Sequence, residues 1–261
     1  MAAIAGLYHE QHGPLDAPPL ILSSGLGGSA SYWAPNIAAL AKRHRVIAYD
    51  HRGTGRSDPA LPDPCTVADM AADIVKLMDG LGIAQASVVG HAAGGAAGLA
   101  LALTAPDRVN RLVVVNGWAA PDPHFARCID TRAALLRDAG ARAYVRATPL
   151  FLYPADWSSE HSVRLDAEED AGVAALPPAA ILEARIAALR AFDISLMLGS
   201  IDVPVMALCA ADDMLVPSAC SARLAEGIAG AQLRTMAWGG HACNVTDPRT
   251  FAALVGEFLG G

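Results

Sequence analysis

The 261-residue sequence lacks the features that mark several classes of protein. It has no run of about 18 uncharged apolar residues, so no segment is expected to span a membrane. It has no basic run, and its formal net charge of -7 argues against nucleic acid or an anionic membrane as a partner. Residues 1–6 have neither a basic start nor a long apolar stretch, so no signal peptide is expected.

Paired cysteines and cofactor motifs are also missing. The five cysteines are widely spaced, with no CxxC pair, at positions 65, 128, 209, 220 and 243. This odd count predicts reduced thiols and a cytoplasmic location. No cluster of histidine, cysteine and acidic residues has metal-ligand spacing, so no metal is expected. The glycines at 90, 94 and 95 do not form a GxGxxG motif, so no dinucleotide cofactor is expected.

What the sequence does contain is an alternation of short apolar runs with longer helical patterns. The apolar runs are β-branched and nearly continuous in hydrophobicity, which predicts strands at 20–22, 45–49, 86–89, 112–115 and 203–208. A short apolar strand is also expected at 232–237, and a weaker strand pair near 4–9. Helical patterns lie between the strands, at 33–42, 66–82, 93–105, 217–228 and 248–259. The order predicts one α/β domain with a mostly parallel, doubly wound sheet.

Residues 119–200 break this alternation, because they show amphipathic helical patterning and no clear strand. We therefore expect a core made of 1–118 and 201–261, with 119–200 inserted as a group of helices. The insertion leaves the carboxyl end of a central strand, where open α/β sheets bind ligands, so it is predicted to form a lid over the site. An inert packing insertion is the alternative. The pocket beneath the lid is expected to be small and partly polar.

The strongest local signal is Gly90-His91-Ala92-Ala93-Gly94, between a predicted strand and a predicted helix. Small residues at 90 and 94 permit the tight turn of a G-x-S-x-G nucleophile elbow. Ala92 takes the nucleophile-elbow position but has no oxygen, so an acyl-serine intermediate cannot form there. In an alanine-rich chain, an ordinary glycine-rich turn is an equally good interpretation of this motif alone.

A second glycine-rich stretch follows the first predicted strand. In a fold with this elbow, the backbone N–H groups of Leu26 and Ala93 are expected to form the oxyanion hole. A plain glycine-rich turn is the commoner meaning of such a stretch. Ser24, Ser29 and Cys243 are weaker candidates for a nucleophile.

Two further candidates each follow a predicted strand, and these are Asp213 and His241. Their order after position 92 is nucleophile, acid, histidine, as in a hydrolase triad of this kind. We predict that Asp213 orients His241 and that His241 acts as a general base. Asp212 is the second choice for the acid. A lone histidine or an Asp-Asp pair is usually structural, but their joint occurrence in this order favours a dyad.

The four tryptophans are expected to line the substrate pocket, because they fall at predicted strand ends or in the lid. They are Trp33, Trp118, Trp157 and Trp238. Core packing is the alternative for each of them.

Several segments resemble known families. The turn at 50–57, Asp-His-Arg-Gly-Thr-Gly-Arg-Ser, resembles the D-x-R-G-x-G-x-S turn of the α/β-hydrolase superfamily. The segments at 25–33, 115–118, 149–157 and 239–248 together resemble the RutD family, α/β-hydrolases of the bacterial pyrimidine-utilisation pathway. The resemblance covers nearly the whole chain, and it implies an α/β-hydrolase fold with a helical lid.

The resemblance also implies a function, the hydrolysis of carbamate or 3-aminoacrylate, which are small products of uracil degradation. The family tolerates alanine at the elbow, which implies that Ala92 is native and not an engineered serine replacement. Without the serine, water is the expected nucleophile and His241 its base. Two alternatives remain: a cofactor-free lyase or oxygenase using the same dyad, and a non-catalytic binding protein. A homodimer through the lid is a further expectation.

Overall fold

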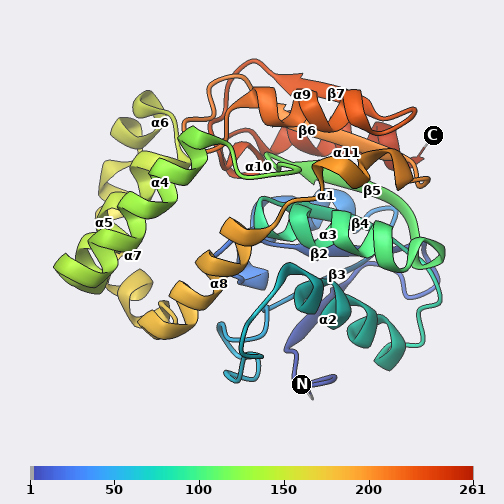
Figure 1. The fold of residues 1–261 in the computed structure, drawn as a ribbon, viewed down its shortest axis with the longest axis horizontal. Coiled ribbons are helices and arrows are strands. Elements are labelled where there is room, and N and C mark those ends of the chain that lie inside the picture. The colour runs from blue at the N-terminus through green and yellow to red at the C-terminus, as the bar shows by residue number, and fades with distance from the viewer. Residues whose placement is uncertain (1–2, 261) are drawn as a thin grey trace.

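The computed structural model describes residues 3–260, in which seven strands form one sheet (Figure 1). The strands follow the order β1-β3-β2-β4-β5-β6-β7. Their bounds are β1 (His9–His12), β2 (Pro19–Ser23), β3 (Arg45–Tyr49), β4 (Ala86–His91), β5 (Val109–Val115), β6 (Val205–Ala210) and β7 (Gln232–Met236). Only β1 is antiparallel to its neighbour, and the other pairs are parallel. Residues 1–2 and 261, at the outer ends of the two expected core segments, lie outside the described residues.

The strands expected from the apolar runs are all present, but the weak strand pair near 4–9 is a wrong prediction. Ile4 and Leu7 form only an isolated bridge, and the edge strand starts at His9. The physical reason is a tight turn, since Ala5 and Gly6 both have positive φ, at 52° and 80°.

Helices cover both faces of the sheet. One face carries α2 (Val67–Gly80), α3 (Ala93–Thr104) and α9 (Ser218–Gly227), which share one hydrophobic core. The other face carries η1 (Ala30–Trp33), α1 (Ala34–Leu40), α10 (Cys243–Thr246) and α11 (Pro248–Gly260) with a second core. A short helix, η2 (Pro106–Arg108), precedes β5. Burial on both faces explains why the central strands read as continuous apolar runs.

The segment at 119–200 contains helices and no strand. Its elements are α4 (Pro123–Ala134), the π-helical η3 (Leu135–Ala139), α5 (Gly140–Leu152), α6 (Ala155–Glu160), α7 (Ser162–Ala175), α8 (Ala179–Ala191) and η4 (Ser195–Ser200). In Figure 1, α4 to α7 form a group beside the sheet, and α8 leads back to it. Within residues 3–260, no single helix is long and apolar enough to cross a membrane; only α7 and α8 reach that length and composition, as a pair bent by 95°.

The turn after β3 clamps the glycine-rich loop that follows β2. The Asp50 side chain is 1% exposed and accepts hydrogen bonds from the Ala30 N–H at 2.8 Å and from the Arg56 N–H and Nε, each at 2.9 Å. Thr54 Oγ1 donates to the Gly28 carbonyl at 3.0 Å. The D-x-R-G-x-G-x-S motif is therefore structural in this chain, because it holds the loop that carries the first oxyanion-hole candidate.

Asp50→Asn should lower the free energy of unfolding by about 1–3 kcal/mol, because the amide would leave buried N–H groups without an acceptor. Burial acts to raise the pKa of Asp50, but hydrogen bonds from Arg56 and two backbone N–H groups hold it below its ordinary value. A carboxylate with a lowered folded-state pKa stabilises the fold fully above the unfolded pKa of about 3.9. This contribution is lost as the pH falls through the folded-state pKa.

Urea denaturation at neutral and acidic pH measures this difference. Asp170→Asn is the matched control, because its side chain is 84% exposed and its ion pair should contribute less than about 0.5 kcal/mol. The clamp would be contradicted if the two variants lost equal amounts of unfolding free energy. It would also be contradicted if the difference in unfolding free energy between wild type and Asp50→Asn did not become smaller at acidic pH.

Candidate active site

The turn between β4 and α3 has the backbone of a nucleophile elbow. Ala92 has φ 49° and ψ -108°, and its N–H donates to the Val115 carbonyl at 2.9 Å. A Cβ on Gly90 would overlap the Gly94 backbone, and a Cβ on Gly94 would overlap the Ser23 carbonyl group. Glycine is therefore required at both positions by close packing, and the turn presents Ala92 to a cavity at the carboxyl edge of the sheet.

The expected contact between Asp213 and His241 is present. His241 Nδ1 donates to Asp213 Oδ2 at 2.8 Å, and the side chains are 3% and 0% exposed. The other carboxylate oxygen accepts from the Leu215 and Val216 N–H groups, at 2.8 and 2.9 Å. Because Nδ1 carries the hydrogen in this contact, Nε2 keeps its lone pair, and His241 lines the same cavity as Ala92.

Three side chains fix the loop that carries the histidine. Asn116 Nδ2 donates to the His241 carbonyl at 2.7 Å, and His91 Nε2 donates to the same oxygen at 2.8 Å. Asp212 Oδ1 accepts from the Gly240 N–H at 2.9 Å, so this acid holds the loop and is not the partner of the imidazole. Sequence reasoning did not identify Asn116 or His91 as functional. For Asn116, its position directly after the buried strand β5 was a usable signal.

His91 is a second buried imidazole beside the elbow. Its ring lies 4.6 Å from that of His241 between centroids, and its Nδ1 is buried without a partner among residues 3–260. Burial, and then the neighbouring His241, hold the pKa of His91 well below its ordinary value. His91 is therefore neutral at neutral pH and adds no positive charge beside the elbow.

The two predicted oxyanion donors, Leu26 and Ala93, both line this cavity. Ala93 is the first residue of α3, so its N–H has no intrahelical acceptor and lies at the positive end of the helix dipole. Among the described residues, neither N–H donates to a backbone acceptor. The geometry thus leaves both donors available, and their role as an oxyanion hole stays a prediction.

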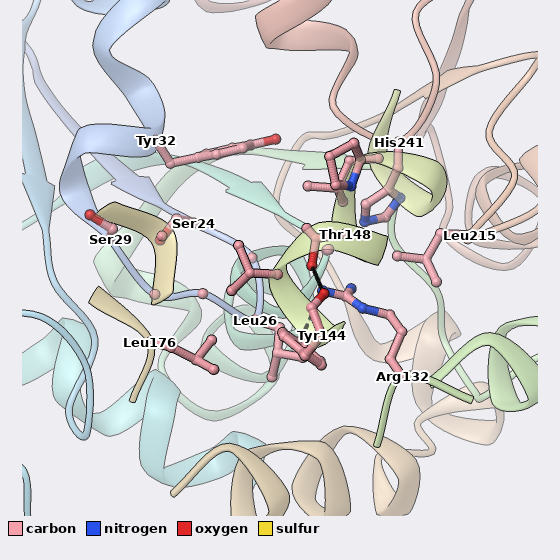
Figure 2. Close-up of a pocket in the computed structure, with 18 of the residues that line it drawn as sticks. Ser24, Leu26, Ser29, Tyr32, Arg132, Tyr144, Thr148, Leu176, Leu215 and His241 are labelled. Atoms are coloured by element: carbon pink, nitrogen blue, oxygen red, sulfur yellow. Dashed lines mark hydrogen bonds between the residues drawn. The ribbon is translucent and has the colours of Figure 1, made fainter. Parts of the chain in front are cut away.

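The cavity has a volume of about 450 Å³ and lies between the carboxyl edge of the sheet and the lid (Figure 2). It is larger than the small pocket expected. Most of the lid side of its wall is formed by α4, α5 and α7. Trp118, Pro149 and Leu152 are part of the wall, as expected for the lid segment. Its polar groups include His241 and three lid side chains that the sequence did not single out, which are Arg132, Tyr144 and Thr148.

Three of the four tryptophans do not line the cavity, which corrects the sequence prediction. Only Trp118 does. Trp33 is fully buried in the core on the other face of the sheet. Trp157 stacks on His161 inside the lid, with ring centroids 3.9 Å apart, and Trp238 is 37% exposed at the surface. Position near a strand end did not determine which tryptophans line the cavity, because the direction of each side chain depends on packing.

The alternative nucleophiles are not equally placed. Cys243 is fully buried outside the cavity, and burial raises the pKa of its thiol to about 12, so it stays protonated. Ser29 lines the cavity but bonds to Ser31 Oγ at 2.7 Å, whereas the Ser24 hydroxyl is buried there without a partner among the described residues. Within residues 3–260, no group of three or more His, Cys, Asp or Glu side chains is placed to hold a metal ion.

A buried arginine connects the inserted helices to the glycine-rich loop that follows β2. Arg185 of α8 donates to the Leu26 carbonyl at 3.3 Å and to His51 Nδ1 at 2.9 Å. His51 Nε2 is then left to donate to Ser23 Oγ at 3.1 Å. Burial and the charge of Arg185 hold the pKa of His51 well below its ordinary value, so this network carries one positive charge. Sequence reasoning missed it, because helical periodicity does not reveal which arginine turns inward.

Comparisons with known proteins identify the family and the fold. The model of the alpha/beta hydrolase fold family matches residues 18–162. A protein of Caulobacter segnis named "Putative carbamate hydrolase RutD" is 56% identical over 261 residues, which is 99% of this chain and 98% of that protein. A Variovorax paradoxus protein of the same name is 50% identical over 97% of this chain and 96% of its own length.

Solved structures show the same fold. The enol-lactonase of Burkholderia xenovorans superposes with a TM-score of 0.90 at 31% identity, covering 100% of this chain and 99% of that one. A thermophilic esterase of Thermogutta terrifontis has a TM-score of 0.84 at 23% identity, over 97% and 92% of the two chains, which supports the fold alone. With its sheet, elbow and dyad in place and more than half its residues shared over almost its full length, the chain belongs to the RutD family of α/β-hydrolases.

Proposed function

We propose that this protein hydrolyses a small molecule at a C–N bond, with water as the nucleophile and His241 as the general base. One observation carries the proposal: His241, oriented by its hydrogen bond to the buried Asp213, lines the same cavity as the elbow residue Ala92, which has no oxygen. A protein that only binds its ligand has no need of an imidazole held in one tautomer by a buried carboxylate. The pair therefore favours catalysis over binding alone.

The proposed steps use groups already present in the cavity. A water in the space that a serine hydroxyl would fill loses a proton to His241 Nε2 as it attacks the substrate carbon. Where the attacked carbon is a carbonyl, the Leu26 and Ala93 N–H groups hold the oxygen that becomes negative. His241 then returns the proton to the leaving nitrogen. The imidazolium that forms in between is stabilised by Asp213.

The substrate candidates are carbamate and 3-aminoacrylate, taken from the names of the relatives and from the family resemblance. Carbamate and water give bicarbonate and ammonia. 3-Aminoacrylate first shifts a proton from its nitrogen to C2, which gives the imine. Water then adds to the imine carbon, and the new hydroxyl gives up its proton as ammonia leaves, so the products are 3-oxopropanoate and ammonia. Either reaction would serve uracil degradation and nitrogen utilisation.

We also propose the cytoplasm as the location, because all five cysteines are buried and unpaired, as expected in a reducing compartment. A homodimer through the lid stays a prediction. It is supported by two exposed apolar side chains of the lid, Leu150 at 65% and Val163 at 84% exposure.

His241→Gln should reduce the catalysed rate by about 10²- to 10⁴-fold, because a positioned general base contributes that much. Asp213→Asn should also cost at least about tenfold, since asparagine no longer favours the required tautomer. Asp212→Asn should cost less, because Asp212 bonds only the Gly240 N–H of the loop. The measurement is ammonia release from freshly generated 3-aminoacrylate and from carbamate, each against the same buffer without protein.

The spontaneous decay of both compounds makes the protein-free rate the essential control. If the unmodified protein gives no rate above it with either compound, hydrolysis is ruled out for these substrates and a binding role takes precedence. If Asp212→Asn costs as much as Asp213→Asn, the assignment of the acid is wrong.

Ala92→Ser should install a nucleophile, because a hydroxyl is the one group that this elbow lacks. The variant should gain labelling by a serine-directed fluorophosphonate and some activity on a small activated ester, whereas the unmodified protein should show neither. Intact-mass spectrometry with peptide mapping identifies the labelled residue.

A folded Ala92→Ser protein that stays unlabelled would mean that His241 does not reach residue 92. Labelling of the unmodified protein would place another nucleophile in the cavity, with Ser24, Ser29 and Cys243 to be tested first, and the water mechanism would have to be withdrawn.

A further inference from the structure

Arg132 is a buried cation without an acidic partner. The residue is 6% exposed and lies near the end of α4, directly before the π-helical turn η3. Its Nη2 donates to Tyr144 Oη at 2.9 Å and to Thr148 Oγ1 at 3.3 Å. Within residues 3–260, no aspartate or glutamate oxygen lies within 4.0 Å of its guanidinium. A buried charge is unfavourable unless it is paired, so this arginine lacks the partner that its burial requires.

The guanidinium also has unused hydrogen-bond donors. Its Nε is buried without a partner, and its Nη1 makes no hydrogen bond to the described part of the chain. The rings of Tyr144 and Phe151 lie 4.8 and 5.5 Å from its central carbon, and they hold the group in place without neutralising its charge. A fully structural arginine would have its donors satisfied, as Arg185 does through three acceptors.

The acidic residues that line the other part of the cavity do not provide this partner. Glu169 of α7 is paired with Arg142 at 2.7 Å and with Arg146 at 3.4 Å. Glu168 is paired with Arg164 at 2.8 Å. The remaining acid of that wall, Asp166, is exposed to solvent. The acids of α7 are thus matched by surface arginines or by water, and Arg132 remains the unpaired charge of the inner cavity.

Arg132 and His241 line the same cavity from different parts of the fold. Figure 2 shows the Arg132 side chain entering from the lid and meeting Tyr144 and Thr148, while His241 enters from the core. Thr148 Oγ1 donates to the Tyr144 carbonyl at 2.8 Å, so its hydrogen is used. The Tyr144 hydroxyl accepts from Arg132 and keeps its own hydrogen. Burial raises the pKa of Tyr144, so the phenol stays a donor at neutral pH.

We propose that Arg132, assisted by the Tyr144 hydroxyl, binds the carboxylate of the substrate and so places a second carbon of the same molecule beside His241. A guanidinium presents parallel N–H donors that match the two oxygens of a carboxylate, and such charge-assisted bonds are strong in a buried site. The ligand carboxylate supplies the missing counter-charge.

The substrate class follows from this arrangement and rests on the proposed hydrolysis. The carboxylate that Arg132 binds is separate from the carbon that water attacks, so the substrate is a short carboxylic acid with its C–N bond at another carbon. 3-Aminoacrylate belongs to this class. Carbamate does not, because its single carbon is both the carboxylate and the reacting centre.

Binding of an unreactive probe tests the subsite without turnover. Propanoate has the carboxylate and no reactive nitrogen, and propanamide is its uncharged counterpart. The unmodified protein, titrated by NMR, should bind propanoate in preference to propanamide. Arg132→Gln should weaken propanoate binding by about tenfold or more and leave propanamide unaffected. Arg132→Lys should restore part of the loss, because it returns the charge without the fork.

Arg190→Gln is the matched control, because it removes one positive charge from another lid helix, where Arg190 pairs with Asp130 outside the cavity. It should leave propanoate binding unchanged. Tyr144→Phe retains the guanidinium and should weaken propanoate binding by a smaller factor, so it serves if Arg132→Gln does not fold. Propanoate that fails to bind the unmodified protein, or that binds Arg132→Gln equally well, overturns the proposal.

The two proposals fail in different ways. His241→Gln should lose turnover and keep propanoate binding. Arg132→Gln should raise the KM for 3-aminoacrylate, and it should change the rate of carbamate hydrolysis much less. If hydrolysis depends on His241 but propanoate binding does not depend on Arg132, only the proposed carboxylate subsite is wrong. If propanoate binding depends on Arg132 but no hydrolysis is measured, the proposed hydrolysis is wrong and the carboxylate-binding site stands.

Discussion

The hydrogen bond between Asp213 and His241 is the interaction on which the chemistry of this site depends. Free imidazole rotates and exchanges tautomers, so it is a base without a defined direction. Here Asp213 also accepts two backbone N–H groups, which prevents its carboxylate from turning away. The histidine backbone is held as well, through its carbonyl, by Asn116 and His91. The lone pair on Nε2 is therefore preorganised, and no serine is needed to hold it in place.

The elbow stores strain although Ala92 has no nucleophilic atom. A positive φ of 49° costs a residue with a Cβ about 1–2 kcal/mol, and the surrounding glycines are needed for packing. The turn still has a purpose in the proposed mechanism. It starts α3 at the cavity, so that the Ala93 N–H has no backbone acceptor, and the methyl group leaves room for a water. The strained backbone is thus present without the serine side chain that such a turn usually carries.

The cavity combines two sources of chemistry. In the proposed mechanism the core supplies the base and the oxyanion donors, and the inserted helices supply Arg132 with its two hydroxyl neighbours. Neutral His91 and neutral His51 keep additional positive charge away from the core side, because burial holds the pKa of each imidazole well below its ordinary value. A substrate with a carboxylate at one end and a C–N bond at the other matches this separation of charge and base. Arg185 connects the two parts, because it bonds the oxyanion loop from the lid helix α8.

Local sequence patterns were enough to predict the main helices and strands and the core half of the candidate site. Apolar periodicity is local, so the central strands and their helices were predictable. Position 92, Asp213 and His241 each follow a strand, and the carboxyl ends of parallel strands meet at one edge of the sheet, so their approach to one another was predictable as well. The residues that the inserted helices contribute to the cavity could be identified only from the packed structure. Arg132 resembles any arginine on an amphipathic helix until α4 and α5 pack and bury it in the cavity wall away from acidic partners. The inward or outward direction of the tryptophans was decided in the same way. Whether a buried charge has a partner depends on contacts between distant segments, and no pattern within one segment contains that information.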